Sequence, residues 1–161
     1  MSNSKIIPFP EPEKLKTMQI DNQSVLIGGC FDILHYGHLM FFQKAAALGK
    51  HLIVALESDE FIVKRKKRQP FHTQMHRAEM LAALTIIDAV ILLPFMQTDN
   101  EYFDLVKQIK PSVIAVTAGD AYLKQKQEQA SQIGAIVQEV TELLKPFSTS
   151  QILDYATILR D

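Results

Sequence analysis

The stretch GGCFDILHYGH, residues 28–38, connects an apolar run to a helical pattern. The run before it, Ser24–Ile27 (SVLI), is typical of a short buried strand that ends in a glycine turn. The residues after it, through Leu48, favour a helix that stops at Gly49. A buried strand followed directly by a helix is the repeating unit of a parallel α/β sheet, so this stretch indicates the fold class.

The same alternation continues along the chain. Further strands are expected at His51–Glu57, Asp88–Leu93, Val113–Thr117 and Ala135–Val140. Helices are expected at Thr73–Leu84, Asn100–Ile109, Ala121–Ile133 and Ser148–Leu159, with a loop or partial helix at 58–72. The pattern predicts a single α/β domain over residues 23–161, with a doubly wound parallel five-stranded sheet and helices on both faces.

The composition is that of an ordinary soluble domain. The 161 residues are 47% hydrophobic and 22% charged with a net charge of −1, so the overall charge indicates neither nucleic acid nor an anionic membrane as a partner. No apolar run approaches the roughly 20 residues that a membrane-spanning helix needs, so no membrane insertion is expected. The single cysteine, Cys30, excludes an internal disulfide and favours a cytoplasmic location.

Residues 1–22 carry a different pattern. Prolines at alternate positions of the segment 8–12 disfavour a helix, so we expect an extended, proline-rich N-terminal arm. Ile6, Ile7 and Phe9 give this arm apolar side chains that can dock on the domain. The segment has no apolar core of the kind found in secretory signals.

Two histidines, His35 and His38, lie where the first strand is followed by a helix. In a parallel α/β sheet this is the carboxyl edge, where ligands bind. The helix N-terminus there offers free N–H groups and the positive end of the helix dipole, which suit phosphate. The histidines can therefore face a bound phosphate. Alternatively, His38 packs in the core and His35 caps the helix, with no ligand.

The segment Gly29–His38 (GCFDILHYGH) resembles the signature G-[TC]-F-D-x-x-H-x-G-H of the cytidylyltransferase-like nucleotidyltransferases, with every fixed position present. The resemblance implies a Rossmann-like fold and a dimer. It implies transfer of a nucleoside monophosphate from a nucleoside triphosphate to a small phosphorylated acceptor, with release of pyrophosphate. It also implies that His35 and His38 are catalytic, and that nucleotide is bound by Gly29, Cys30, Phe31, Asp32 and Gly37. From the residues alone, Phe31 favours a core position and Cys30 a small packed side chain.

The chemistry fits imidazole. When an acceptor attacks the α-phosphorus, negative charge moves to the bridging oxygen as pyrophosphate leaves. The protein must hold two anions in line and stabilise that charge, which N–H donors at a helix N-terminus can do. No protein nucleophile is required.

A basic run, Lys64–Arg68, contains five of the 17 lysines and arginines. Alone it also fits a solvated loop or a nucleic-acid patch. It follows the second strand, however, and related enzymes hold substrate phosphates there. The resemblance implies a catalytic role for Lys64 and phosphate or acceptor binding by Lys66 and Lys67. It also implies that Arg77 reaches the phosphates, whereas the alternative is a surface arginine paired with an acid.

Two later motifs are also implied to bind nucleotide. Gly119 and Asp120 follow the fourth strand and match a family G-D pair, although Asp120 fits equally as a helix N-cap. The turn Ser148-Thr149-Ser150 resembles the family's closing S-T-[TS] turn, although capping alone would explain Ser148.

The same motifs leave the nucleotide and the acceptor open. Cytidylyl members carry an arginine just before the closing turn, where this chain has LKPF at 144–147, and Lys145 is the candidate replacement for binding phosphate. The sequence AGDA at 118–121 matches neither the adenylyl nor the cytidylyl form. Both departures also fit a nucleotide-binding module without catalysis. CTP and ATP therefore both remain candidates as the donor.

The segments resemble different branches of the family. The motif at 29–38 is most similar to heptose-phosphate adenylyltransferases, the loop after residue 57 to glycerol-phosphate cytidylyltransferases, and the segments 73–84 and 88–93 to archaeal-type FAD synthases. Sugar phosphate or glycerol 3-phosphate is therefore expected as the acceptor, with phosphocholine, phosphoethanolamine and FMN as alternatives. Mg²⁺ is expected with the triphosphate. No cluster of cysteine and histidine has zinc spacing, so no structural metal is expected.

Overall fold

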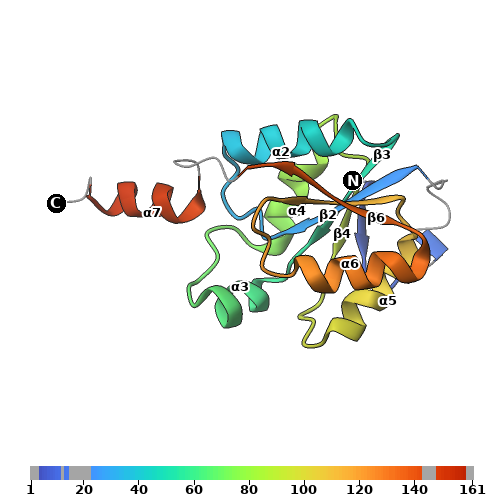
Figure 1. The fold of residues 1–161 in the computed structure, drawn as a ribbon. Coiled ribbons are helices and arrows are strands. Elements are labelled where there is room, and N and C mark those ends of the chain that lie inside the picture. The colour runs from blue at the N-terminus through green and yellow to red at the C-terminus, as the bar shows by residue number, and fades with distance from the viewer. Residues whose placement is uncertain (1–3, 12, 15–22, 143–147, 159–161) are drawn as a thin grey trace.

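The structure is a computed structural model that describes residues 4–11, 13–14, 23–142 and 148–158 (Figure 1). Its strands are β1 (Ile6–Pro8), β2 (Ser24–Gly29), β3 (His51–Leu56), β4 (Ala89–Leu92), β5 (Val113–Thr117) and β6 (Ile136–Thr141). Its helices are α2 (Tyr36–Ala46), α3 (Asp59–Lys66), α4 (Gln74–Ala82), α5 (Asp99–Ile109), α6 (Leu123–Ile133) and α7 (Thr149–Ile158). The predicted elements are therefore present, with ends shifted by one or two residues. No helix in these ranges is long and apolar enough to cross a membrane.

The strands form one sheet in the order β1-β4-β3-β2-β5-β6, and every neighbouring pair is parallel. From β2 the chain adds β3 and β4 on one side and then returns to add β5 and β6 on the other. The strand order therefore reverses between β2 and β5. In open parallel sheets the crevice at the carboxyl end of such a reversal is where ligands bind.

The predicted count of five strands was wrong by one. Ile6–Pro8, in the predicted arm, pairs with β4 in parallel register from Ile6 opposite Val90. Ile7 is fully buried, and the Lys5 ammonium donates a hydrogen bond to the carbonyl oxygen of Ile87 at 2.7 Å. A strand of three residues is too short to show a period, and Pro8 is tolerated because β1 lies at the edge of the sheet.

Helices cover both faces of the sheet, as predicted (Figure 1). Alternate residues of β2 point to opposite faces, so Val25 and Ile27 pack with α2 and α4, while Leu26 packs with α5 and α6. Each face thus has its own apolar core. Helix α7 extends away from the sheet in Figure 1.

Side-chain caps mark several helix starts. The Thr73 hydroxyl accepts a hydrogen bond from the His76 N–H, which confirms the predicted cap, and Ser58 caps α3 in the same way. The Ser148 hydroxyl accepts from the Gln151 N–H at 3.2 Å. The segment predicted as a loop or partial helix is helical over Asp59–Lys66 and ends where Lys67 adopts a positive φ of 57°.

Candidate active site

The two histidines of the HYGH segment stack on each other at the start of α2. Their ring centroids lie 3.7 Å apart with an interplanar angle of 21°. His35 occupies the N-cap position, but its side chain makes no capping hydrogen bond. The buried Nδ1 atoms of His35 and His38 have no hydrogen-bond partner within the described part of the chain. The sequence-based alternative of a capping His35 side chain is therefore not what the structure shows.

Both rings are uncharged near neutral pH. Burial, and then the neighbouring His35, lower the pKa of His38 to about 3, while a hydrogen bond with the Ile33 backbone acts in the opposite direction. Burial also lowers the pKa of His35. A neutral imidazole has one N–H donor and one acceptor nitrogen. The N–H of His35 can therefore donate to a phosphate oxygen, and that of His38 can do so in exchange for its bond with the Ile33 backbone.

The turn between β2 and α2 is closely packed around Phe31. This residue has a positive φ of 44°, and its ring meets the rings of His38 and Phe42 edge-on, at 5.1 Å between centroids in each case. A Cβ atom on Gly29 would lie 2.9 Å from the Phe31 ring, so a side chain at this position would displace the ring. Phe31 is buried, in line with the core position that its residue type favours.

Asp32 organises the loop between α3 and α4. It is 1% exposed, and its carboxylate accepts hydrogen bonds from the N–H groups of Phe71 at 2.9 Å and His72 at 3.0 Å. Arg68 forms an ion pair with the same carboxylate. Burial alone would raise the pKa of Asp32, but the bonds from His72, Phe71 and Arg68 hold it below its ordinary value. Its carboxylate thus holds this loop beside the histidines.

Arg77 is completely buried, with 0% exposure. Its guanidinium donates to the carbonyl oxygens of Cys30 and His72 and forms an ion pair with Asp59 at 2.7 Å. The alternative of a surface arginine was therefore wrong, because these acceptors enclose the guanidinium. Arg77 joins the end of β2, the loop before α4 and the start of α3. Its contact with phosphate stays a prediction.

The lysines of the basic run lie in different surroundings. Lys64 forms an ion pair with Glu60 at 2.6 Å and lies 4.6 Å from the centroid of the Phe95 ring. Lys66 acts on Cys30, in the turn after β2, through its charge. Burial raises the pKa of Cys30 to about 11, and the positive charge of Lys66 opposes that rise. Lys67 ends α3, as described above. Cys30 is held as a thiol, which leaves it unsuited to act as a nucleophile.

Gly119 and Asp120 lie at the carboxyl end of β5. Gly119 has a φ of 76°, a conformation that favours glycine. The N-cap of α6 is Tyr122, so the predicted N-cap role of Asp120 was wrong. Instead, the Asp120 carboxylate accepts from the Tyr122 N–H at 2.8 Å and pairs with Lys126 at 2.7 Å.

The closing turn, Ser148-Thr149-Ser150, is described, whereas residues 143–147 before it lie outside the described residues. Ser148 caps α7, and Thr149 and Ser150 form its first turn. Lys145 lies outside the described residues. Nucleotide contacts by these residues stay predictions.

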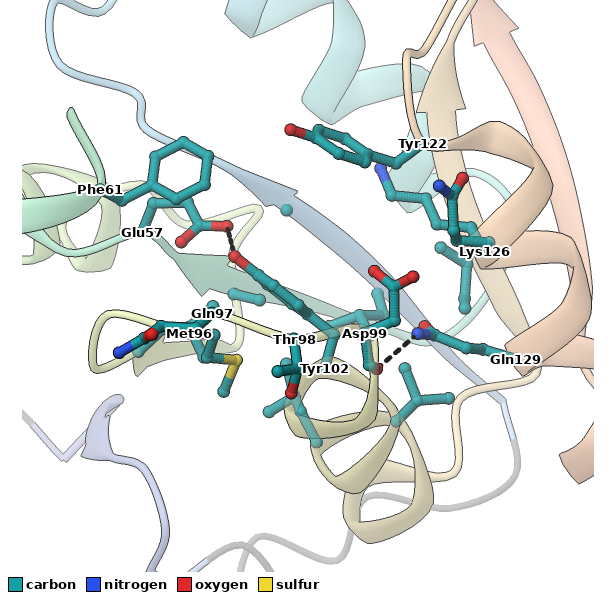
Figure 2. A pocket seen from close by; sticks show the side chains of 18 of the residues that line it. Glu57, Phe61, Met96, Gln97, Thr98, Asp99, Tyr102, Tyr122, Lys126 and Gln129 are labelled. Carbon is teal, nitrogen blue, oxygen red and sulfur yellow. Dashed lines mark hydrogen bonds between the residues drawn. The ribbon is translucent and has the colours of Figure 1, made fainter. Parts of the chain in front are cut away.

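A cavity of about 300 Å³, which the sequence did not indicate, lies between the carboxyl ends of the strands and helices α5 and α6 (Figure 2). Its polar groups include Glu57, directly after β3, and Tyr102 of α5. The Tyr102 hydroxyl donates to Glu57 Oε1 at 3.0 Å. Glu57 Oε2 is buried and has no hydrogen-bond partner in the described ranges. A carboxylate at a strand end was the available signal, but its burial depends on helices far along the chain.

Glu57 binds its proton more tightly than an ordinary carboxyl. Burial raises its pKa from 4.5 to about 7, opposed by the Tyr102 hydrogen bond and by the charges of Lys126, Arg77 and Lys66. The folded state therefore binds this proton more strongly than the unfolded state does. The resulting stabilisation is complete below about pH 4.5 and is lost as the pH rises through about 7.

Glu57→Gln should remove this dependence. As the pH rises from 5 to 8, the unfolding free energy of wild type should fall by up to about 3 kcal/mol through this group. The unfolding free energy of Glu57→Gln should not show this fall. Urea unfolding across this range measures the difference. Glu128→Gln, on the exposed face of α6, serves as the control and should follow wild type. Parallel curves for wild type and Glu57→Gln would contradict the prediction.

The fold is an open parallel α/β sheet, and the histidine turn follows β2 at the carboxyl end of the strand reversal. The chain belongs to the cytidylyltransferase-like family, whose model matches residues 26–154. The resemblance to this family found in the motif at 29–38 is thereby confirmed.

Three similar proteins illustrate the range of the family. The chain is 41% identical to an FAD synthase of Pyrococcus abyssi over 92 residues, 57% of this chain and 60% of that protein. It is 38% identical to the bifunctional protein HldE of Helicobacter hepaticus over 157 residues, 94% of this chain and 30% of that protein. A lipopolysaccharide core biosynthesis protein from Thermoplasma volcanium shares the fold, with a TM-score of 0.61 and 23% identity, covering 74% of this chain and 95% of that one.

Proposed function

We propose that this protein transfers the adenylyl group of ATP to the phosphate of a small phosphorylated acceptor and releases pyrophosphate. The observation that carries the proposal is the stacked pair of neutral rings, His35 and His38, at the N-terminus of α2, whose Nδ1 atoms have no partner in the described part of the chain. Nothing in the described fold uses these nitrogens, whereas a triphosphate would.

In the proposed reaction an oxygen of the acceptor phosphate forms a bond to the α-phosphorus of ATP. The bond from that phosphorus to the α–β bridging oxygen breaks, and pyrophosphate leaves with the electron pair. The N–H groups of His35 and His38 donate to the oxygens that gain charge, and the first N–H groups of α2 add their dipoles. Lys66 and Lys67 are proposed to hold phosphate, and Arg77 keeps the surrounding backbone in place.

Similarity supports ATP as the donor. The similar FAD synthases are named for making FAD, and FAD contains an adenylyl group, which ATP can donate. CTP is the alternative donor. Sugar phosphate and glycerol 3-phosphate, the acceptors favoured by the sequence, and FMN are all substrates of the proposed reaction class. Homodimerisation and a cytoplasmic location remain predictions.

Mg²⁺ is proposed to enter with the triphosphate. No group of three or more His, Cys, Asp or Glu side chains in the described ranges is arranged to hold a metal. The triphosphate oxygens are themselves good Mg²⁺ ligands, and the ion would neutralise part of their charge.

A pyrophosphate-release screen tests the proposal. ATP and CTP, each with Mg²⁺, would be crossed with heptose 1-phosphate, glycerol 3-phosphate, phosphocholine, phosphoethanolamine and FMN. We expect release with ATP and one acceptor. No release with any pair, while ATP still binds, would overturn the proposal and leave a nucleotide-binding module without catalysis.

A further inference from the structure

The cavity beside Glu57, defined above and called here the Glu57 cavity, reaches the end of β2, just before the histidine turn. Gly28 lines it, and the next residue, Gly29, begins the turn that leads to the HYGH segment. Its other walls come from β2, β3, α3, the loop after β4, α5, β5 and α6. The cavity and the histidine turn therefore meet at consecutive residues of the chain, Gly28 and Gly29.

The walls of the Glu57 cavity are mainly apolar. Aliphatic side chains from four elements contribute to them, among them Leu26, Leu93, Met96, Leu105, Val106 and Ile114. Aromatic rings stand at two sides: Phe61 near Glu57, and Tyr122, which is 50% exposed. Such walls suit a rigid, largely apolar body, because its apolar surface leaves water on binding.

Some polar groups in the cavity already have hydrogen-bond or ion-pair partners within the protein, and one carboxyl oxygen has none among the residues described. Lys126 is paired with Asp120, and the Gln129 side chain donates to the carbonyl oxygen of Asp99 at 3.0 Å (Figure 2). Glu57 is 9% exposed, and its Oε1 accepts from Tyr102, but Oε2 has no partner in the described ranges. A buried carboxyl oxygen without a partner calls for a donor, and a ligand in the cavity can supply one.

We propose that the Glu57 cavity binds the non-phosphate part of the acceptor, and that this part is an aromatic heterocycle whose ring N–H or O–H donates a hydrogen bond to Glu57 Oε2. The inference rests on the proposed function, since it places the acceptor phosphate at the histidine turn. Among the candidate acceptors it selects FMN, whose isoalloxazine ring carries one N–H, over sugar phosphate and glycerol 3-phosphate.

The test measures binding without catalysis. Riboflavin, which has the ring but no phosphate, is titrated with the full chain by fluorescence, and ATP binding is measured separately. We expect riboflavin to bind in the micromolar range. Tyr122→Ala removes an exposed aromatic wall, and Glu57→Gln leaves one oxygen, already bonded to Tyr102, as acceptor. Each should weaken riboflavin binding at least tenfold and change ATP binding less than twofold.

Matched variants separate the cavity from general effects. Tyr155→Ala on α7 and Glu128→Gln on α6 lie outside the Glu57 cavity and should bind riboflavin as wild type does. Absence of riboflavin binding, or equal binding by wild type, Tyr122→Ala and Glu57→Gln, would overturn the inference. Turnover of ATP with glycerol 3-phosphate but no riboflavin binding would overturn the inference and leave the proposed function standing. Riboflavin binding without turnover of any acceptor would overturn the function alone.

Discussion

His38→Ala should lower kcat/KM for nucleotidyl transfer by about 10²–10³-fold, the usual effect of removing one donor to a charge that develops in the transition state. The ring is neutral, and its Nδ1 has no partner among the residues that the structure describes. His35 stacks on His38 and is proposed to stabilise the same developing negative charge, so His35→Ala should lower kcat/KM by a similar factor. The double variant should lose less than the product of the two, since the rings act as a unit.

Stability should change far less than activity. Alanine removes the contacts of His38 with Phe31 and Phe42, which we expect to lower the unfolding free energy by about 1–2 kcal/mol. Pyrophosphate release and thermal unfolding, measured on the same preparations, separate the two effects. His76→Ala, an exposed histidine on α4, is the control and should keep full activity. Activity that falls only in proportion to the unfolded fraction would contradict the catalytic role.

Asp32→Asn should destabilise the protein by about 2–3 kcal/mol, because it removes a buried carboxylate that accepts two backbone N–H groups and an arginine. The loss is larger than that of a surface ion pair, since Arg68 is left partly buried without its partner. It should also weaken activity, because the loop at 68–72 is held against the histidine turn through this carboxylate and through the bond from Arg77 to His72.

Urea unfolding and hydrogen exchange of the Phe71 and His72 amides would measure the effect of Asp32→Asn. The pKa of Asp32 is lowered from 3.8, so its stabilisation is present above that pH and is lost as the pH falls through the lower folded value. The unfolding free energy of Asp32→Asn should therefore fall less steeply than that of wild type as the pH is lowered into the acid range. Asp104→Asn, an exposed partner of Lys107, should change stability by less than about 0.5 kcal/mol. Equal effects of the two substitutions would refute the assigned role of Asp32.

The parallel α/β fold and the family could both be predicted from the sequence. Alternating apolar strands and amphipathic helices are local patterns, and the ten positions from Gly29 to His38 carry the family signature in consecutive residues. Neighbouring residues along the chain are constrained by the backbone itself. The strand, the turn and the start of α2 therefore follow from the order of the residues alone.

Only the tertiary structure decided which partners these residues have. Burial of Arg77 and its ion pair with Asp59 join residues 18 positions apart, and Asp32 meets Arg68 across 36 positions. The sixth strand and the Glu57 cavity likewise depend on segments that are distant in the chain. The sequence alone does not distinguish a polar side chain that faces solvent from one that faces a ligand or another side chain. Its surroundings, which set its charge and its role, exist only once the sheet and its helices have packed together.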